Sequence, residues 1–192
     1  MFLGFDTETT GLPPKFKPLD HPEMPDIVQL CAKLFDLDRV YASINLIVLP
    51  TVPITEGSLK IHGISQELCE KVGVSRRVMV SMFQNLLKSA DMIVCHNLKF
   101  DLERMLTAYS REGISTQLLM EKKKYCTMLE STSIVGIQTP KGPKWPTLQE
   151  AYIKLVDPKG FENAHDAEVD VNAMIPIFRA LQNGSGCQNV TA

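Results

Sequence analysis

The chain begins with a short apolar run, residues 1–5, that ends directly at two acidic residues, Asp6 and Glu8. An apolar run of this length followed by charge is typical of a buried strand that delivers side chains from its carboxyl end. Because side chains alternate between the two faces of a strand, Asp6 and Glu8 lie on the same face. The fold must therefore accommodate two neighbouring carboxylates at the end of a buried strand.

Three more residues that carry chemistry lie far from this pair: Asp101 in the segment HNLKFD, and His165 and Asp170 in the segment HDAEVD. We expect the fold to direct all five side chains at one point. Clustered carboxylates repel one another, whereas Mg²⁺ or Mn²⁺ bound by their oxygens turns that repulsion into affinity. Taken singly, each residue also suits a solvated turn, a helix cap or an exposed helix face. The prediction of a divalent-metal site depends on their joint occurrence.

The length of 192 residues and the hydrophobic content of 44% are those of one globular domain. We expect this domain to span residues 1–182 and a flexible polar tail to occupy residues 183–192. No apolar stretch is long enough to cross a bilayer, and charge follows the first apolar residues without a secretory segment. We therefore expect a cytoplasmic protein with no membrane contact. The five cysteines include no C-x-x-C pair, which argues against zinc.

Strand patterns fill the first part of the chain. After residues 1–5, strands are expected at 27–35 and at 44–49, where alternate positions are apolar. The connection over residues 13–26 contains five prolines and has neither a helical nor a strand period, which predicts an exposed loop. Three strands in succession suggest an antiparallel meander.

Helical patterns dominate after residue 53. Ser75 is expected to cap one helix, and Thr147 with Glu150 forms the capping box of another. Between them, residues 91–95 resemble a buried strand, followed by a helix with Asp101 near its start and by a short strand near Tyr125. A last helix is expected from about residue 165 to 181, kinked at Pro176. This order predicts a mixed α/β sheet layered with helices, antiparallel at one edge.

The net charge is −2, whereas proteins that bind nucleic acid usually carry a basic surface. Two divalent cations would add four positive charges and bring the total to +2, so the charge does not exclude a polyanionic substrate. The lysine run at residues 122–124 is typical of a solvated surface. Lys141 and Lys144 flank Gly142 and Pro143 just before Trp145, the only tryptophan. Trp145 either anchors its own loop or, with these lysines, helps to grip a single strand by stacking.

In this order and spacing, the segments FDTETTGL, HNLKFD and HDAEVD resemble the three motifs of the DnaQ-like exonuclease family, subclass DEDDh. The segments IVQLCAKLF, IHGIS, YCTM and WPTLQEAYIKL are also similar to that family, so the resemblance covers about residues 1–181. It implies a ribonuclease-H-like fold, with a five-stranded mixed sheet in which three antiparallel strands precede the parallel ones. It also implies two metal ions, Mg²⁺ or Mn²⁺, and hydrolysis of nucleic acid from the 3′ end.

The resemblance assigns a role to each of the five residues. Asp6 bridges both metals, Glu8 and Asp170 complete one coordination sphere, and Asp101 lies near the second. His165 acts as general base, which suits an imidazole because it is mostly neutral at working pH. Two metals clamp the attacking and leaving oxygens of a phosphodiester and lower the pKa of bound water.

Helical spacing alone suggests a different partner for Asp170. Residues four apart share a helix face, so a purely helical reading would choose Asp166 as the second ligand and place His165 elsewhere. If His165 lies at or before the helix N-terminus, the helical period does not fix its direction, and Asp166 can cap the helix. The resemblance favours this second arrangement.

Substrate contacts are inferred from the same resemblance. Thr7 is expected to offer backbone groups to the terminal nucleotide, Leu12 to wedge beside the last base, and Ile61 with His62 to pack on the nucleotide. Asn97 and Phe100 are further candidates. For Leu12, Ile61 and Phe100 the alternative is packing in the core.

The leading hypothesis is a metal-dependent 3′-5′ exonuclease that acts on single-stranded or frayed nucleic acid, with DNA favoured, and releases nucleoside 5′-monophosphates. One alternative is a catalytically silent module that binds nucleic-acid ends or a polymerase, and another is an RNA-trimming or oligoribonuclease-type enzyme. The expected partners are 3′ ends of single-stranded DNA or RNA. A polymerase is a candidate partner, although the tail shows no apolar motif for docking to a sliding clamp.

Overall fold

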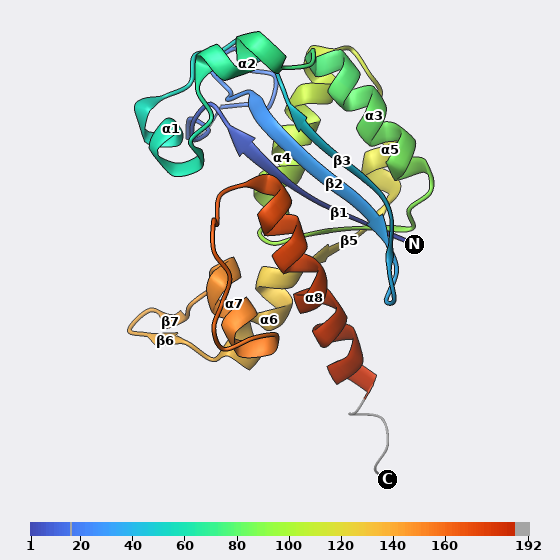
Figure 1. The fold of residues 1–192 in the computed structure, drawn as a ribbon, viewed down its shortest axis with the longest axis vertical. Helices are drawn as coiled ribbons and strands as arrows, with labels where there is room; N and C mark the ends of the chain where they lie inside the picture. Colours follow the sequence, from blue (N-terminus) through green and yellow to red (C-terminus); the bar gives the residue numbers. More distant parts are fainter. Residues whose placement is uncertain (16, 187–192) are drawn as a thin grey trace.

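The computed structural model describes residues 1–15 and 17–186. In it, five strands form the central sheet in the order β3-β2-β1-β4-β5 (Figure 1). The first three pair antiparallel, whereas β4 pairs parallel with β1 and β5 pairs parallel with β4. This arrangement confirms the predicted mixed sheet. The strands are β1 (Phe2–Thr9), β2 (Ile27–Phe35), β3 (Val40–Ile47), β4 (Met92–Cys95) and β5 (Lys123–Cys126).

Strand β3 begins at Val40, four residues before the predicted start at 44, and ends at Ile47, two residues before the predicted end at 49. The cause is a tight turn after β2, in which Asp36 Oδ1 accepts hydrogen bonds from the N–H groups of Asp38 (2.8 Å) and Arg39 (2.9 Å). Pairing with β2 therefore starts at Val40. The first residues of β3 are exposed, so the apolar alternation that marks its later part does not extend to its start.

Helices cover both faces of the sheet. One core cluster joins the sheet to α3, α4 and α5, and a second joins it to α8. Both caps expected from the sequence are present, since Ser75 accepts the N–H of Val78 and Thr147 forms a capping box with Glu150. The helices are α1 (Glu56–His62), α2 (Gln66–Val72), α3 (Arg76–Lys88), α4 (Leu98–Arg111), α5 (Gln117–Glu121), α6 (Thr127–Val135), α7 (Leu148–Leu155) and α8 (Ala167–Gly186).

The last helix differs from its prediction at both ends. It begins at Ala167 rather than 165, and it continues to Gly186, so residues 183–186 extend the helix instead of starting the predicted tail. The rest of that tail, residues 187–192, lies outside the described residues. Pro176 does lie inside the helix, and a kink there stays a prediction. Of the helices in the described part of the chain, none has the length and apolar character that a bilayer crossing requires.

The proline-rich connection is held more tightly than an exposed loop would be. The Arg111 guanidinium on α4 donates hydrogen bonds to three carbonyl oxygens of the connection, those of His21 (3.3 Å), Pro22 (3.0 Å) and Met24 (2.7 Å). Met24 and the residues up to β2 are buried. The prediction of an exposed connection is therefore wrong for its C-terminal part.

Asp26 is the anchor of this region. Its carboxylate forms ion pairs with Arg111 and with Arg76 (2.8 Å) and accepts the N–H of Thr51 at 2.6 Å. Its main-chain carbonyl accepts the N–H of Thr10 at 2.9 Å. Asp26 thus connects the end of β1, the start of β2 and helices α3 and α4, and it fixes the segment that follows the acidic pair.

A small hairpin that the sequence did not indicate precedes α7. It consists of β6 (Gln138–Thr139) and β7 (Gly142–Pro143), and it projects from the body of the molecule (Figure 1). Two-residue strands carry too short a pattern to be recognised by alternation.

Candidate active site

The predicted residues meet at the carboxyl end of β1. A cavity of about 580 Å³ opens there, and all five proposed catalytic residues line it. They come from β1, the first turn of α4, the turn before α8 and the first turn of α8. The complete lining is Asp6, Thr7, Glu8, Thr9, Gly11, Leu12, Thr55, Gly57, Ser58, Ile61, His62, His96, Asn97, Phe100, Asp101, His165 and Asp170.

A sharp turn between β4 and α4 directs Asp101 at the strand end. Asn97 has a left-handed backbone (φ 69°), which asparagine adopts more readily than most residues, and the helix begins at the next residue. Asp101 then lies buried in the first turn, where a carboxylate also interacts favourably with the helix dipole.

Thr7 holds Asp101 in place. Its N–H donates to Asp101 Oδ1 at 3.0 Å and its hydroxyl donates to the same atom at 2.7 Å. The Thr7 N–H is therefore already bonded within the protein, and the expectation that Thr7 offers backbone groups to the terminal nucleotide stays a prediction. The two residues are 94 positions apart, and no local pattern reports such a contact.

His165 lies two residues before the start of α8, as expected from the arrangement in which Asp166 caps the helix and His165 precedes it. Its backbone is left-handed (φ 70°) and its side chain is exposed. The Asp166 side chain caps the helix, accepting the N–H groups of Glu168 (2.8 Å) and Val169 (3.3 Å). Asp166 therefore serves as a cap, and it does not line the cavity.

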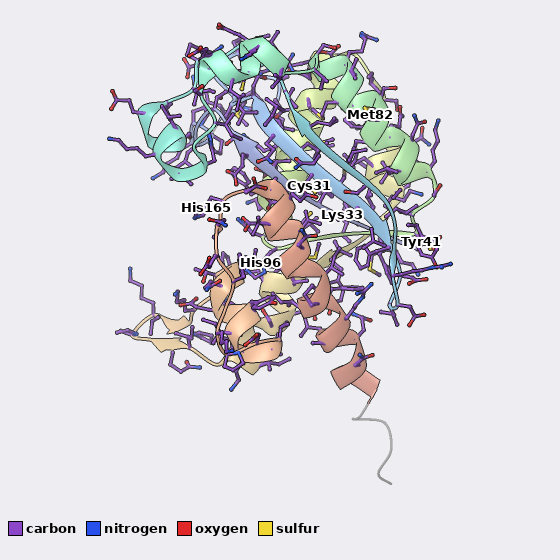
Figure 2. All side chains as sticks on the ribbon, in the orientation of Figure 1. Cys31, Lys33, Tyr41, Met82, His96 and His165 are labelled. Atoms are coloured by element: carbon purple, nitrogen blue, oxygen red, sulfur yellow. The ribbon has the colours of Figure 1, made fainter. Side chains whose placement is uncertain are left out.

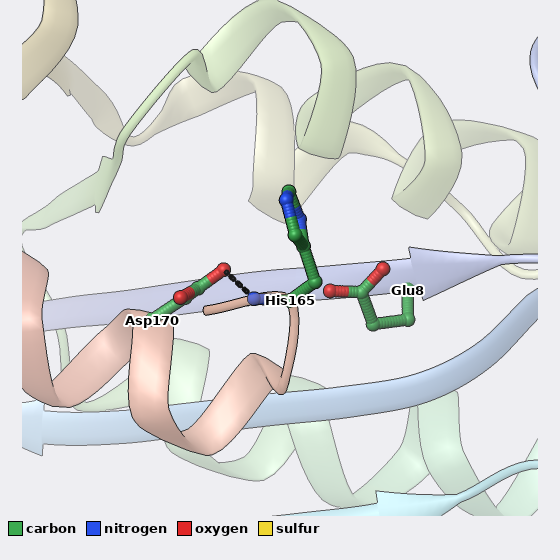
Figure 3. Close-up of side chains that lie close together, drawn as sticks. All are labelled: Glu8, His165 and Asp170. Carbon is green, nitrogen blue, oxygen red and sulfur yellow. Dashed lines mark hydrogen bonds between the residues drawn. The ribbon is translucent and has the colours of Figure 1, made fainter. Parts of the chain in front are cut away.

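Asp170 and His165 are linked directly. The main-chain N–H of His165 donates to Asp170 Oδ2 at 3.2 Å, as Figure 3 shows. Asp170 Oδ1 is buried and has no hydrogen-bond partner in the described structure. One ligand atom from each of Glu8, His165 and Asp170 lies within 4.8 Å of the other two. A buried carboxylate oxygen without a donor next to a second carboxylate is suited to a bound cation.

The electrostatics of the cavity support the same conclusion. Burial, and then the neighbouring carboxylates, raises the pKa of Asp6 well above its ordinary value. Burial and the charge of Asp170 raise the pKa of Glu8 to about 8. Burial raises the pKa of Asp101 to about 7 against the opposing bonds from Thr7, and that of Asp170 to about 6 against the opposing N–H of His165. The residues present fit a divalent metal, whose charge would offset this repulsion.

The ring nitrogens of the other two histidines of the cavity, His62 and His96, already form hydrogen bonds within the protein. His62 Nδ1 accepts the N–H of Ile64 (3.0 Å), so its proton is on Nε2, which donates to the carbonyl of Thr9 (3.1 Å). His96 Nε2 lies 3.1 Å from the carbonyl of Pro146 and donates to it, while Nδ1 lies 3.0 Å from the Thr127 hydroxyl. Burial lowers the pKa of both rings. Within the described residues, the His165 ring makes no hydrogen bond and is the histidine of this cavity whose nitrogens are accessible.

Apolar side chains form the rim of the cavity. Leu12 is 85% exposed and Ile61 is 58% exposed, which rules out the alternative that they pack in the core. Phe100 is half-buried, with the Arg104 guanidinium 5.4 Å from its ring centroid. Asn97 is exposed and also lines the cavity. The predicted substrate-contact residues are thus brought together.

Several lining residues were not expected. They belong to the turn after Glu8, to the start of α1 and to the end of β4: Thr9, Gly11, Thr55, Gly57, Ser58 and His96. The Thr55 N–H donates to the Thr10 carbonyl (2.8 Å) and its side chain caps α1. A threonine with helix-capping character before IHGIS was the available signal.

The basic groups singled out in the sequence do not line the cavity. Lys144 forms an ion pair with Glu150 at 2.6 Å, so its charge is partly neutralised. Trp145 is 64% exposed in the segment between the β6–β7 hairpin and α7. In the lysine run, Lys122 donates to the Ala90 carbonyl (2.6 Å) and Lys124 donates to that of Met120 (2.7 Å). Two of its members thus also bind the backbone of neighbouring segments.

Comparisons with known proteins agree with this geometry. A family model described as exonuclease, RNase_T, matches residues 3–178. No curated protein matches the sequence. Crystal structures of E. coli exonuclease I are similar in fold: the complex with a dA16 oligonucleotide has a TM-score of 0.73 at 19% identity, and the complex with a dT13 oligonucleotide has a TM-score of 0.77 at 17% identity.

The two alignments cover most of this chain but less than half of the relative. They include 95% and 97% of this chain, against 40% and 42% of the exonuclease I chains. The common part is therefore one domain-sized unit, and at these identities the likeness concerns the fold.

Proposed function

The chain belongs to the RNase_T exonuclease family, and from this premise we propose that it is a metal-dependent 3′-5′ exonuclease acting on single-stranded or frayed nucleic acid, with DNA favoured. Its products are nucleoside 5′-monophosphates. One observation carries the proposal: five side chains with the chemistry of phosphodiester hydrolysis, separated by up to 164 positions, line a single cavity. A catalytically silent binding module has no need of this complete set.

Four carboxylates would hold the metals. Asp6, Glu8 and Asp170 would hold one ion, and Asp6 with Asp101 would hold the second. When bound, Mg²⁺ or Mn²⁺ supplies an activated water and stabilises charge on the leaving oxygen. Support comes from the raised pKa values of these acids and from the unpartnered Oδ1 of Asp170.

His165 would take the proton from the attacking water. Its ring is exposed to the cavity and has no competing protein hydrogen bond among the described residues, unlike those of His62 and His96. Its N–H bond to Asp170 ties the position of the base to that of a metal-binding carboxylate. A general base contributes about 100- to 10,000-fold to such a reaction.

The apolar rim would receive the terminal nucleotide. Leu12 and Ile61 offer exposed apolar surface at the cavity, and an aromatic ring, Phe100, is within the same lining. A base has an apolar face that stacks on such groups, while its phosphate is drawn toward the metals. The preference for DNA is supported by the oligodeoxynucleotides that the exonuclease I structures contain.

A digestion assay tests the proposal. Purified protein should shorten a 5′-labelled oligonucleotide in Mg²⁺ or Mn²⁺, release mononucleotides, and stop when a chelator is added. A covalently closed single-stranded circle should stay intact, because it has no 3′ end. Matched DNA and RNA oligonucleotides in the same assay test the sugar preference. Undiminished cleavage by both Asp6→Ala and His165→Ala, or cleavage of the circle, would contradict the proposal.

A further inference from the structure

We propose that Gln29 is a positioning residue for His165: its side-chain amide fixes the turn that presents the imidazole, and it does so from the strand next to the acidic pair. This inference rests on the proposed function, in which His165 is the general base.

Both ends of the Gln29 amide are bonded to the start of α8. Oε1 accepts the N–H of Ala167, the first residue of the helix, at 3.1 Å. Nε2 lies 3.4 Å from Asp166 Oδ1 and donates at 3.1 Å to Asn45 Oδ1 on β3. Gln29 is only 4% exposed, so these bonds form away from water. An amide can accept and donate at the same time, which neither a carboxylate nor an apolar side chain of this length can do.

The position of Gln29 in the sheet connects the two halves of the site. In the β1–β2 register, Gln29 pairs directly with Glu8. Directly opposite residues of an antiparallel pair present their side chains on the same face, with Cβ atoms about 4.5–5.5 Å apart. One register position therefore carries a proposed metal ligand on β1 and, on β2, the attachment for the turn that holds the base.

His165 needs such an attachment because of its own backbone. Its left-handed φ of 70° is unfavourable for a residue with a Cβ atom and persists only where surrounding contacts determine it. The bonds available to do so are its N–H to Asp170 and those that Gln29 makes to the next two residues, Asp166 and Ala167. Removing the Gln29 amide leaves the N–H of Ala167 buried without this partner.

A second attachment farther along α8 provides a matched control. Lys33, which is also on β2, donates to Asn172 Oδ1 at 2.7 Å and to Glu168 Oε1 at 3.2 Å. Figure 2 shows Lys33 beside α8 and His165 on the loop that leads into the helix. Lys33 does not line the cavity. Its loss should loosen the helix without releasing the turn at His165.

The first test compares Gln29→Met with Lys33→Met in rates of single-stranded DNA hydrolysis. We expect Gln29→Met to lower kcat by about 10- to 100-fold with little change in KM, as the loss of an outer positioning partner does. Lys33→Met should keep kcat within about twofold at a comparable loss of melting temperature. Equal losses of kcat in the two variants would overturn the proposal, because they would indicate a general effect of helix stability.

A double variant tests whether Gln29 acts through His165. In a His165→Ala background, Gln29→Met should have no further effect on the residual rate, since there is no imidazole left to position. If Gln29→Met lowers the residual rate by the same factor as in the wild-type background, Gln29 does not act through His165 and the inference is wrong.

Amide hydrogen exchange in metal-free protein gives a readout that is independent of activity. We expect the N–H of Ala167 to exchange at least about tenfold faster in Gln29→Met and to be unchanged in Lys33→Met. If Gln29→Met does not fold, Gln29→Glu replaces it, because this variant keeps the acceptor for Ala167 but cannot donate to Asp166 when ionised. It should also lower kcat about tenfold or more, and wild-type kcat in Gln29→Glu would overturn the proposal.

The roles of His165 and Gln29 can be disproved separately. Wild-type activity in His165→Ala would contradict the proposed general base, whatever Gln29 does. A strong loss in His165→Ala combined with wild-type kcat in Gln29→Met would leave the proposed function intact and overturn only the positioning role.

Discussion

Asp170 and His165 are joined by a hydrogen bond in which the His165 main-chain N–H donates to Asp170 Oδ2 at 3.2 Å. The bond uses the backbone of one residue and the side chain of the other, so the His165 imidazole stays available. Through this bond Asp170, a proposed metal ligand, holds the backbone of His165, the proposed general base.

His165→Ala should abolish most activity while leaving the protein folded. We expect kcat for single-stranded DNA to fall by about 100- to 10,000-fold, the contribution of a general base. The ring is exposed and makes no hydrogen bond within the described residues, so the free energy of unfolding should change by less than about 0.5 kcal/mol. His21→Ala, in the connection before β2, is the matched control and should keep full activity. Urea denaturation and steady-state kinetics on both variants measure these outcomes.

The metal-free protein should lose stability as the pH rises. The pKa of Glu8 is about 8 in the folded protein and near 4.5 when unfolded, so the unfolded state binds fewer protons between these values and stability falls with increasing pH. The contribution of protonated Glu8 to the free energy of unfolding is fully present below about pH 4.5 and is lost as the pH rises through about 8. Glu8→Gln should remove the part of this dependence that comes from Glu8, leaving that of Asp6, Asp101 and Asp170, and should raise the melting temperature at pH 8 in a chelator. Thermal denaturation across this range checks it, and a flat profile for the wild type would contradict the raised pKa.

Added Mg²⁺ should stabilise the wild-type protein more at pH 8 than at pH 5.5. The carboxylates must be ionised to bind the cation, so protonation at low pH competes with binding. Asp6→Asn should reduce the Mg²⁺-dependent rise in melting temperature at both pH values. An equal rise in Asp6→Asn and wild type would show that Mg²⁺ binds elsewhere.

Asp26→Asn should be strongly destabilising. It leaves the guanidinium groups of Arg76 and Arg111 partly buried without their carboxylate, a change that costs about 3–5 kcal/mol in comparable sites. Burial alone would raise the pKa of Asp26, but the bonds from Thr51 and the charges of the two arginines outweigh it and hold the pKa below its ordinary value. This contribution is therefore present above about pH 4 and is lost as the pH falls through the folded pKa. Urea denaturation at pH 7 and pH 3 measures it, and the variant should differ less from wild type at pH 3.

Leu12→Ala and Ile61→Ala should weaken substrate binding without destabilising the fold. Both side chains are largely exposed at the cavity, and covering an aliphatic side chain of this size contributes about 1.5–3 kcal/mol. We expect KM for single-stranded DNA to rise about tenfold. Leu129→Ala on α6 is a suitable control, since Leu129 is 50% exposed but does not line the cavity. Unchanged KM in both cavity variants would exclude the apolar rim as the base-binding surface.

Trp145 should report on longer strands. It is the only tryptophan and is 64% exposed, so its fluorescence should be quenched when a single-stranded oligonucleotide stacks on it. A mononucleotide, which reaches only the cavity, should leave the signal unchanged. Trp145→Ala should raise KM for an oligonucleotide and have no effect on hydrolysis of a nitrophenyl ester of thymidine 5′-monophosphate. Absence of quenching by the oligonucleotide would indicate that Trp145 only anchors its own loop.

The parts of the site that follow from local rules could be predicted. Alternation along β1 placed Asp6 and Glu8 on one face, the N-cap Ser75 located the start of α3, and the capping box at Thr147 located that of α7. His165 was a harder case, because helical spacing favoured Asp166 and only the family resemblance favoured the histidine. The cap that Asp166 provides explains why both patterns are present in HDAEVD.

The parts that depend on contacts between distant segments could not be predicted. The bonds that Thr7 donates to Asp101 and that Gln29 accepts from Ala167 join residues 94 and 138 positions apart, and neither residue type signals such a partner. The same applies to Arg111, whose three bonds hold a connection that its prolines alone would mark as exposed. Sequence patterns report periodicity within an element, whereas these contacts are set by how the elements pack.

The order in which the chain supplies the site has a consequence for synthesis on the ribosome. Strand β1 contributes the first carboxylates, whereas Asp170 and His165 come with α8, so the cavity is incomplete until the last helix has emerged and packed. A polypeptide that ends before this part of the chain lacks His165 and Asp170, two of the five groups proposed for hydrolysis. The proposed nuclease activity therefore depends on α8 having packed against the sheet.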